Sequence, residues 1–393
     1  MNKLEKVLSS NMCTGCGICV SSPEEMRIDE QGFARPVNQI FDDISLRSCP
    51  GIGIEQMNHS NYDLSWGPVI SSQVGFSTDP MIRKMGSSGG VLTSLLYMCL
   101  NENIVDAAIQ TGASEANPVA NETRIVTNKE ELILNAGSRY APSSPLSVIR
   151  QVKGDGKKYA IVGKPCDVAA IRMAMRVDQS LIDQFPVLLS FMCAGVPSEH
   201  AAKKIIQHLG LKYEDISEFR YRGDGWPGLT KAVTKDGKIK TMVYNDSWGA
   251  VLNKQLQARC KVCADGTGEL ADIVCADAWY ESYNGYPKFE EKEGRSLLLV
   301  RTSHGEKLVK KMIQLDYIDG VESYGIENLK KIQPYQYVRK KTVLARLLPL
   351  KVFCVQTPKF KGFCLDVLIS NAPIVEVFKA ALGTFIRKVK GRF

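Results

Sequence analysis

Short apolar runs alternate with segments of helical periodicity through the middle of the chain. Runs typical of buried strands occupy residues 69–76, 104–110, 159–162, 187–192, 271–279 and 296–301. Helical spacing of apolar residues is found at 90–101, 168–175, 198–209 and 306–313. Strands that alternate with helices are typical of a parallel or mixed sheet covered by helices. We therefore predict a mixed α/β (or α+β) fold.

Turn-forming residues divide this pattern. Residues 29–36 are predicted to turn between two short strands, and residues 66–68 (Trp-Gly-Pro) mark a boundary after them. Residues 235–238 (Lys-Asp-Gly-Lys) predict a hairpin, so antiparallel strands are mixed with the βα units. We expect three parts: an N-terminal segment at 1–66, a mixed-sheet region at 67–338 and a helical tail at 339–393.

The composition is that of a globular protein. The chain has 393 residues, of which 44% are hydrophobic and 23% charged, which suffices for two or three domains. Neither a signal peptide nor a bilayer-spanning apolar stretch is apparent, so we expect a cytoplasmic protein. The twelve cysteines of a cytoplasmic chain are expected to bind metal rather than to form disulfides.

The most specific motif is a run of three cysteines near the N terminus. Cys13, Cys16 and Cys19 are separated by two residues each, and Cys49 directly precedes a proline. Thiolates at this spacing, in a loop that contains glycines, are typical of a [4Fe–4S] cluster. A structural zinc site is the alternative, although zinc loops seldom carry three cysteines at this interval. We predict a ferredoxin-like segment with one cluster, whose fourth ligand is Cys49.

Four further cysteines form a second candidate set. Cys166 and Cys193 follow two of the predicted strands, at the carboxyl ends where open α/β sheets place their sites. Cys260 and Cys263 form a Cys-x-x-Cys pair. Four thiolates are enough for a second cubane or for a zinc ion. Each of the strand-end cysteines is otherwise typical of a small core residue, and Cys275 is a weaker candidate ligand.

A Gly/Ser loop opens directly into the predicted helix at 90–101. It consists of Gly86, Ser87, Ser88, Gly89 and Gly90. The backbone N–H groups of such a loop, together with a helix N terminus, can approach a phosphate. The loop matches neither the Walker A motif nor the dinucleotide-binding fingerprint. A helix entry that needs small residues for close packing explains it equally well.

Two other loops supply polar candidates. Arg139 and Tyr140, in the sequence Gly-Ser-Arg-Tyr, are positioned to meet an anionic or aromatic ligand, or else to form a solvated turn. Lys164 lies at a strand end beside Cys166. We predict Lys164 as the catalytic cation that stabilises a developing anion.

The net charge of +8 is concentrated in the tail. Residues 339–393 contain twelve Lys and Arg against two acidic residues, so the preceding residues are nearly neutral overall. Residues 373–390 have a basic amphipathic pattern, which is typical of a helix that lies on an anionic membrane surface. Packing of this helix on its own domain or on a second subunit is the alternative. The body has no recognisable nucleic-acid module, so no nucleic-acid partner is expected.

The ordered set of motifs at residues 13–19, 86–91, 137–140, 163–166, 193–197 and 259–263 resembles the coenzyme F420 hydrogenase/dehydrogenase beta-subunit family, whose members are iron–sulfur flavoproteins. The resemblance covers about residues 10–310 and excludes the basic tail. It implies FAD in a site that includes residues 86–90, Arg139 and Tyr140. It also implies one or two [4Fe–4S] clusters, held by Cys13, Cys16, Cys19 and Cys49 and by Cys166, Cys193, Cys260 and Cys263.

The predicted function is that of an iron–sulfur flavoprotein oxidoreductase. Such a protein exchanges two electrons with a small-molecule substrate or a deazaflavin-type carrier and single electrons with a ferredoxin-like or other redox partner. Two alternatives stay open: an electron-transfer subunit that docks on a catalytic partner, and a zinc-stabilised binding protein without redox activity. The substrate, the direction of electron flow and the oligomeric state are not predicted.

Overall fold

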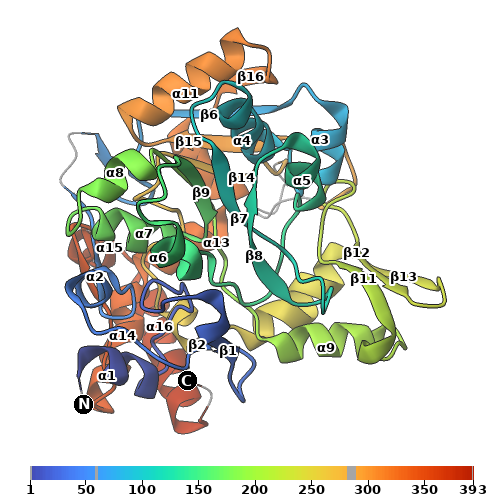
Figure 1. The fold of residues 1–393 in the computed structure, drawn as a ribbon. Coiled ribbons are helices and arrows are strands. Elements are labelled where there is room, and N and C mark those ends of the chain that lie inside the picture. Colours follow the sequence, from blue (N-terminus) through green and yellow to red (C-terminus); the bar gives the residue numbers. More distant parts are fainter. Residues whose placement is uncertain (1, 58–60, 281–288, 392) are drawn as a thin grey trace.

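The structure is a computed structural model that describes residues 2–57, 61–280, 289–391 and 393. Within these residues a mixed eight-stranded sheet forms the centre of the molecule (Figure 1). Its strands, in spatial order, are β16 (Ile318–Ser323), β6 (Ser71–Ser77), β15 (Ser296–Val300), β14 (Ile273–Asp277), β10 (Val187–Phe191), β9 (Tyr159–Gly163), β7 (Ala107–Ala113) and β8 (Asn121–Val126). Strands β14, β10, β9 and β7 are parallel, and the others pair antiparallel. The predicted mixed α/β architecture is confirmed.

Smaller sheets and many helices surround this sheet. The smaller sheets pair β1 (Met26–Ile28) with β2 (Ala34–Pro36), β3 (Gly53–Glu55) with β17 (Lys359–Lys361), β4 (Tyr62–Asp63) with β5 (Gly67–Pro68), and β11 (Ile216–Arg220) with β12 (Thr230–Thr234) and β13 (Ile239–Met242). The helices are α1 (Lys3–Ser9), α2 (Asp43–Ser48), α3 (Pro80–Met85), α4 (Val91–Asn101), α5 (Lys129–Leu134), α6 (Ile149–Val152), α7 (Pro165–Ala174), α8 (Ser180–Gln184), α9 (Glu199–His208), α10 (Ala258–Lys261), α11 (Ser303–Gln314), α12 (Leu329–Ile332), α13 (Pro334–Lys341), α14 (Val343–Val352), α15 (Leu365–Ser370) and α16 (Ile374–Val389). The part of the chain that the structure describes contains no helix with the length and apolarity needed to span a membrane.

Helices cover both faces of the large sheet (Figure 1). Helices α4 and α11 pack on one face, and α6 and α7 pack on the other. In strand β15, Leu297 and Leu299 contribute to one layer, and Leu298 and Val300 to the opposite layer. A strand buried on both faces is therefore mostly apolar, without alternation of polar residues. The turn predicted at 29–36 between two short strands is confirmed, although residues 34–36 already belong to strand β2, and the hairpin at 235–238 is also confirmed.

The N-terminal segment and the C-terminal tail pack together. Strand β17 of the tail pairs parallel with β3 of the segment, which places Phe360 opposite Ile54. Ile54, Phe363 and Leu365 are buried in one core with Ala169 of α7. The two ends of the chain therefore cover α7 jointly. The boundaries at 66/67 and 338/339 and the ferredoxin-like nature of the segment stay predictions; α13 spans the second boundary.

Candidate functional site

The first cysteine set is assembled at one end of the molecule. Cys13, Cys16 and Cys19 lie in the loop after α1, and Cys49 ends α2. The thiol of Cys16 interacts electrostatically with those of Cys19 and Cys49, and Cys13 interacts with the same two thiols. Burial raises the pKa of Cys19 to about 12 and that of Cys49 to about 11. Without a metal these thiols therefore stay protonated at neutral pH.

Glycine is required at two positions of this loop. Gly15 and Gly17 have φ of +74° and +89°, which glycine adopts at little cost. A Cβ on Gly17 would lie 2.7 Å from the main-chain nitrogen of Ser147, and one on Gly15 would lie 2.9 Å from the carbonyl oxygen of Ala34. Close packing against β2 and against residue 147 therefore fixes the shape of the cysteine loop.

The second cysteine set is also brought together. Cys166 lies in the first turn of α7, Cys193 follows β10, and Cys260 and Cys263 lie in and just after α10. The Cys166 thiol interacts with those of Cys193 and Cys260, and Cys193 interacts with Cys263. Burial raises the pKa of Cys193 to about 12. Cys275, in contrast, packs in the apolar layer under α4 and α11 and is not part of the set.

The two cysteine sets are neighbours. The Gln257 side-chain amide donates to the Cys260 sulfur (3.3 Å) and to the carbonyl oxygen of Thr14 (3.4 Å). The Arg259 guanidinium donates to the carbonyl oxygen of Pro50, next to Cys49, over 3.1 and 3.3 Å. The Asp167 carboxylate interacts with Cys16 of the first set and Cys166 of the second. Groups of the body thus hold both sets in one region.

Lys164 is buried beside the second set. Its Nζ lies 2.8 Å from the Asp167 carboxylate and donates to the hydroxyl and carbonyl oxygens of Ser143 over 2.8 and 3.0 Å. Burial alone would lower the pKa of Lys164, but the charges of Asp167 and Cys166 raise it above the usual value. The ammonium group therefore stays charged, and all three of its protons have partners.

The Gly/Ser loop and the loop at 137–140 lie side by side. The Ser138 hydroxyl donates to the Ser87 hydroxyl over 2.7 Å. Ser88 is oriented inward, with its Oγ 2.8 Å from that of Ser296 and 3.1 Å from the carbonyl oxygen of Arg295. A Cβ on Gly89 would lie 2.6 Å from the main-chain nitrogen of Ser296, so that glycine allows close packing on β15. Gly86 ends α3, and Gly90, with φ of +74°, begins α4.

Arg139 and Tyr140 are engaged within the protein. The Arg139 guanidinium donates to the side chain of Asn121 (2.9 Å) and to four carbonyl oxygens, at Phe219, Pro118, Val119 and Ala120. The ring of Tyr140 packs against Trp248, with centroids 4.7 Å apart. These contacts join the 137–140 loop to the segment before β8 and to β11. Arg139 and Tyr140 therefore hold these segments together, and any contact of theirs with a ligand would be additional to that role.

Two buried cations were not predicted from the sequence: Arg222, near the 137–140 loop, and Arg339, near the second cysteine set. Arg222 forms a bidentate pair with Asp277 at the end of β14, over 2.6 and 2.8 Å. Asp277 also accepts from the Trp226 indole, which stacks on Trp279 with centroids 4.8 Å apart. Arg339 of α13 donates to the carbonyl oxygen of Cys193 over 3.1 Å. An acidic residue and a tryptophan at a strand end were visible in the sequence, but their cationic partner was not.

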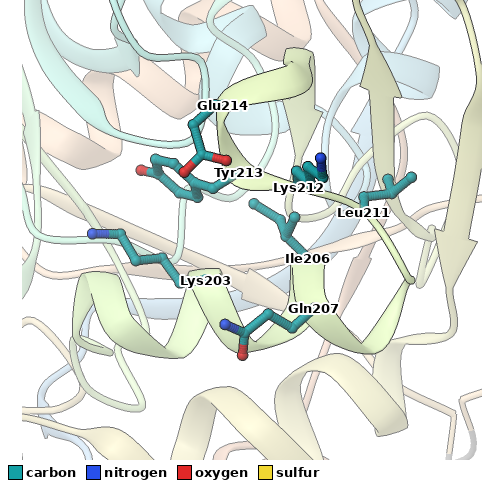
Figure 2. Close-up of a pocket in the computed structure, with 7 residues that line it drawn as sticks. All are labelled: Lys203, Ile206, Gln207, Leu211, Lys212, Tyr213 and Glu214. Carbon is teal, nitrogen blue, oxygen red and sulfur yellow. The ribbon is translucent and has the colours of Figure 1, made fainter.

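One surface hollow lies away from the predicted site residues. Figure 2 shows a surface hollow of about 390 Å³ beside α9, lined by residues that include Lys203, Gln207 and Tyr213. None of the predicted site residues lines it. Among the described residues, no group of three or more His, Cys, Asp or Glu side chains is placed to bind a single metal ion. The residues present fit two iron–sulfur clusters because they supply two groups of four neighbouring thiols, each thiol buried or half-buried.

Comparison with protein-family models decides the family. The model for the N-terminal part of the coenzyme F420 hydrogenase/dehydrogenase beta subunit matches residues 73–150, and the model for its C terminus matches residues 156–323. The chain belongs to this family. The resemblance predicted from the motifs is thereby confirmed. The first cysteine set precedes both matched regions, and α13 to α16 follow them.

Individual proteins with similar sequences support the same family. An uncharacterised protein of Methanocaldococcus jannaschii is 24% identical over 371 residues, which cover 84% of this chain and 95% of the relative. The beta subunit of coenzyme F420 hydrogenase from Methanococcus voltae is 24% identical over 65% of this chain and 84% of its own length. A coenzyme F420-dependent sulfite reductase of M. jannaschii is 24% identical over 84% of this chain, but over only 50% of its own length.

A solved structure has a similar fold. It is a chain of the F420-reducing [NiFe] hydrogenase complex from Methanosarcina barkeri, with a TM-score of 0.58 and 20% sequence identity. The similarity covers 76% of this chain and 96% of the other.

Proposed function

We propose that this protein is an iron–sulfur flavoprotein oxidoreductase that transfers electrons between [4Fe–4S] clusters, FAD and a deazaflavin-type two-electron carrier. The observation that carries the proposal is the assembly of two neighbouring sets of four thiols in a member of this family. Relatives named for coenzyme F420-dependent hydrogenase, formate dehydrogenase and sulfite reductase support the class of carrier.

The thiols would divide between two clusters. Cys13, Cys16, Cys19 and Cys49 would hold the first, and Cys166, Cys193, Cys260 and Cys263 the second. Bound clusters supply one-electron chemistry, and bound FAD connects it to two-electron chemistry. Residues 86–90 and the N terminus of α4 are the proposed contacts of FAD, because backbone N–H groups at a helix N terminus suit its phosphates. The N–H groups of Gly86 and Gly89 already donate to Ile82 and Ser296, so the proposed contacts are those of the other residues of this segment. Arg139 and Tyr140 are proposed to shape this site through their packing.

Side chains around the two cysteine sets would hold the thiols in position and shield them from water. Gln257 and Arg259 bridge the two sets, and Asp167 of the buried pair Lys164–Asp167 interacts with both Cys16 and Cys166. Since every proton of the Lys164 ammonium has a partner, we propose Lys164 as a positioning residue rather than one that touches substrate. Its charge offsets the negative charge of the surrounding thiolates.

A second candidate function is an electron-transfer subunit that acts only within a complex. Several relatives are named as beta subunits, and the similar solved chain belongs to a hydrogenase complex. The two candidates differ in one result: whether the isolated chain, once reduced, converts oxidised coenzyme F420 without a partner. A reduced chain that needs a partner subunit for this reaction favours the second candidate.

Serine variants test the ligand assignment. Cys16→Ser and Cys193→Ser are each expected to lose about four irons per chain, because each removes one ligand of a separate cubane. Cys99→Ser, a buried cysteine of α4 outside both sets, is the matched control and should keep its iron. Iron content and the EPR spectrum of the reduced protein measure the outcome. Retention of all iron in both ligand variants would contradict the assignment.

A further inference from the structure

Helix α16 exposes its apolar face to solvent. Large apolar side chains recur along one side of the helix and are exposed: Ile374, Val375, Phe378, Leu382, Phe385, Ile386 and Val389. Phe378 is 65% and Val389 63% exposed. At 3.6 residues per turn these positions fall within about a third of the helix circumference. A surface helix of a globular protein normally directs such a stripe into its own core.

The opposite face of α16 is the one that packs on the protein. This face consists mainly of small or polar residues, which include Ala380, Gly383 and the fully buried Thr384. It lies against α14. Glu376, also on this side, is 3.4 Å from the ammonium group of Lys341 in α13. The helix is therefore anchored by its small and polar side, and the described part of the chain leaves the apolar stripe largely exposed.

The exposed apolar surface continues beyond α16. The ring of Phe353, just after α14, packs against that of Phe385 with centroids 5.4 Å apart. Val352, next to it, is 76% exposed, and Leu348, one turn earlier in α14, is 57% exposed. Two neighbouring helices thus contribute to one apolar surface. Exposed apolar patches of this kind mark sites of protein or membrane contact.

Basic side chains border the apolar stripe. The helical spacing puts the exposed Lys379 and Lys390 along one border and Lys388 along the other. Lys351 is exposed at the end of α14. In residues 343–391, the only acidic residues are Asp366 and the paired Glu376. A stripe of aliphatic and phenylalanine side chains flanked by lysines matches the acyl boundary and the anionic headgroups of a lipid surface.

We propose that α16 and the end of α14 dock the protein on an anionic membrane surface, with the apolar stripe inserted between the headgroups. The lysines favour this occupant over a second copy of the chain. A two-fold contact through the same stripe would bring the lysine borders of both copies together, and like charges across an interface are unfavourable.

Vesicle sedimentation with the full-length protein tests the proposal. The protein should bind phosphatidylcholine vesicles that contain phosphatidylglycerol and should bind pure phosphatidylcholine vesicles much more weakly. The double variant Phe378→Ser, Leu382→Ser should bind the vesicles at least about tenfold more weakly, because each of the two native side chains would bury apolar surface in the membrane. Both positions are exposed, so folding and cofactor content should not change.

The matched control combines two substitutions of exposed apolar residues, Leu134→Ser and Ile239→Ser. They lie in α5 and β13, and Figure 1 shows both elements away from α16. Unchanged vesicle binding by this control supports the proposal. Absence of binding by the wild-type chain, or equal binding by the α16 variant, would overturn it. A second result would also overturn it: light scattering shows that the wild-type chain is a dimer and the α16 variant a monomer, and the wild-type chain does not bind vesicles.

Discussion

At the scale of single residues, Asp277 is the counterion of Arg222, a buried cation near the 137–140 loop. The side chains of Arg222 and Asp277 are 3% and 18% exposed. Asp277→Asn would leave the Arg222 charge without its counterion and should lower the free energy of unfolding by about 3–5 kcal/mol. Denaturant unfolding measures the change. Glu115→Gln, which breaks an exposed pair with Arg124, should cost less than about 1 kcal/mol; equal losses would contradict the assigned role.

Gly17 permits a separate test of the first cysteine loop. Gly17→Ala would force a Cβ against Ser147 at a positive φ, so it should displace the loop and reduce iron by about four atoms per chain. Gly156 is the matched control, because it has a φ of +83° and a Cβ added to it would meet nothing within 4 Å. Gly156→Ala carries the same backbone cost without a collision, and it should keep its iron. Equal iron in both variants would contradict the packing argument.

The identities of the cysteines were predictable at this scale because clustered thiols at a fixed spacing have few uses in a protein. The sequence also indicated the loops at 86–90 and 137–140, which the structure brings together at Ser87 and Ser138. The partners of Arg139 and Arg222 were not predictable. An arginine that binds carbonyl oxygens of distant segments looks in sequence like one that binds a ligand, since only the fold supplies the oxygens.

At the scale of elements, helix α13 belongs to the core although it begins the basic part of the chain. Lys340 is paired with the buried Glu269 over 2.6 Å, and Arg339 donates to Cys193. A chain that ends at residue 338 should therefore lose stability and iron, because the buried Glu269 would lose its counterion and Cys193 would lose its contact with Arg339. A chain that ends at residue 371, without α16, should keep both. Thermal unfolding and iron content measure this difference, and identical behaviour of the two truncations would contradict it.

The central strands of the large sheet could be predicted from the sequence, whereas its edge strands could not. The central strands β9, β10 and β15 were recognisable because they are almost entirely buried and mostly apolar. The edge strands β8 and β16 were missed, since most of their side chains are partly or fully exposed. An edge strand takes its conformation from its neighbour rather than from an apolar pattern.

At the scale of the whole molecule, the two ends of the chain meet around α7 and bring the cysteine sets together. Strand pairing of β3 with β17 joins residues more than three hundred positions apart. The sequence indicated each set separately, but no local pattern specifies contacts such as Thr14 with Gln257 or Pro50 with Arg259. Pairing at such separations depends on the completed core. The adjacency of the two sets is therefore the principal result that the fold adds to the sequence.

The most direct test of this account is the cofactor content of anaerobically purified protein. Iron, sulfide, zinc and flavin would be measured, together with the visible spectrum before and after dithionite. The account predicts about eight irons and one flavin per chain, with bleaching on reduction. Zinc without iron or flavin would contradict it and would favour a zinc-stabilised binding protein.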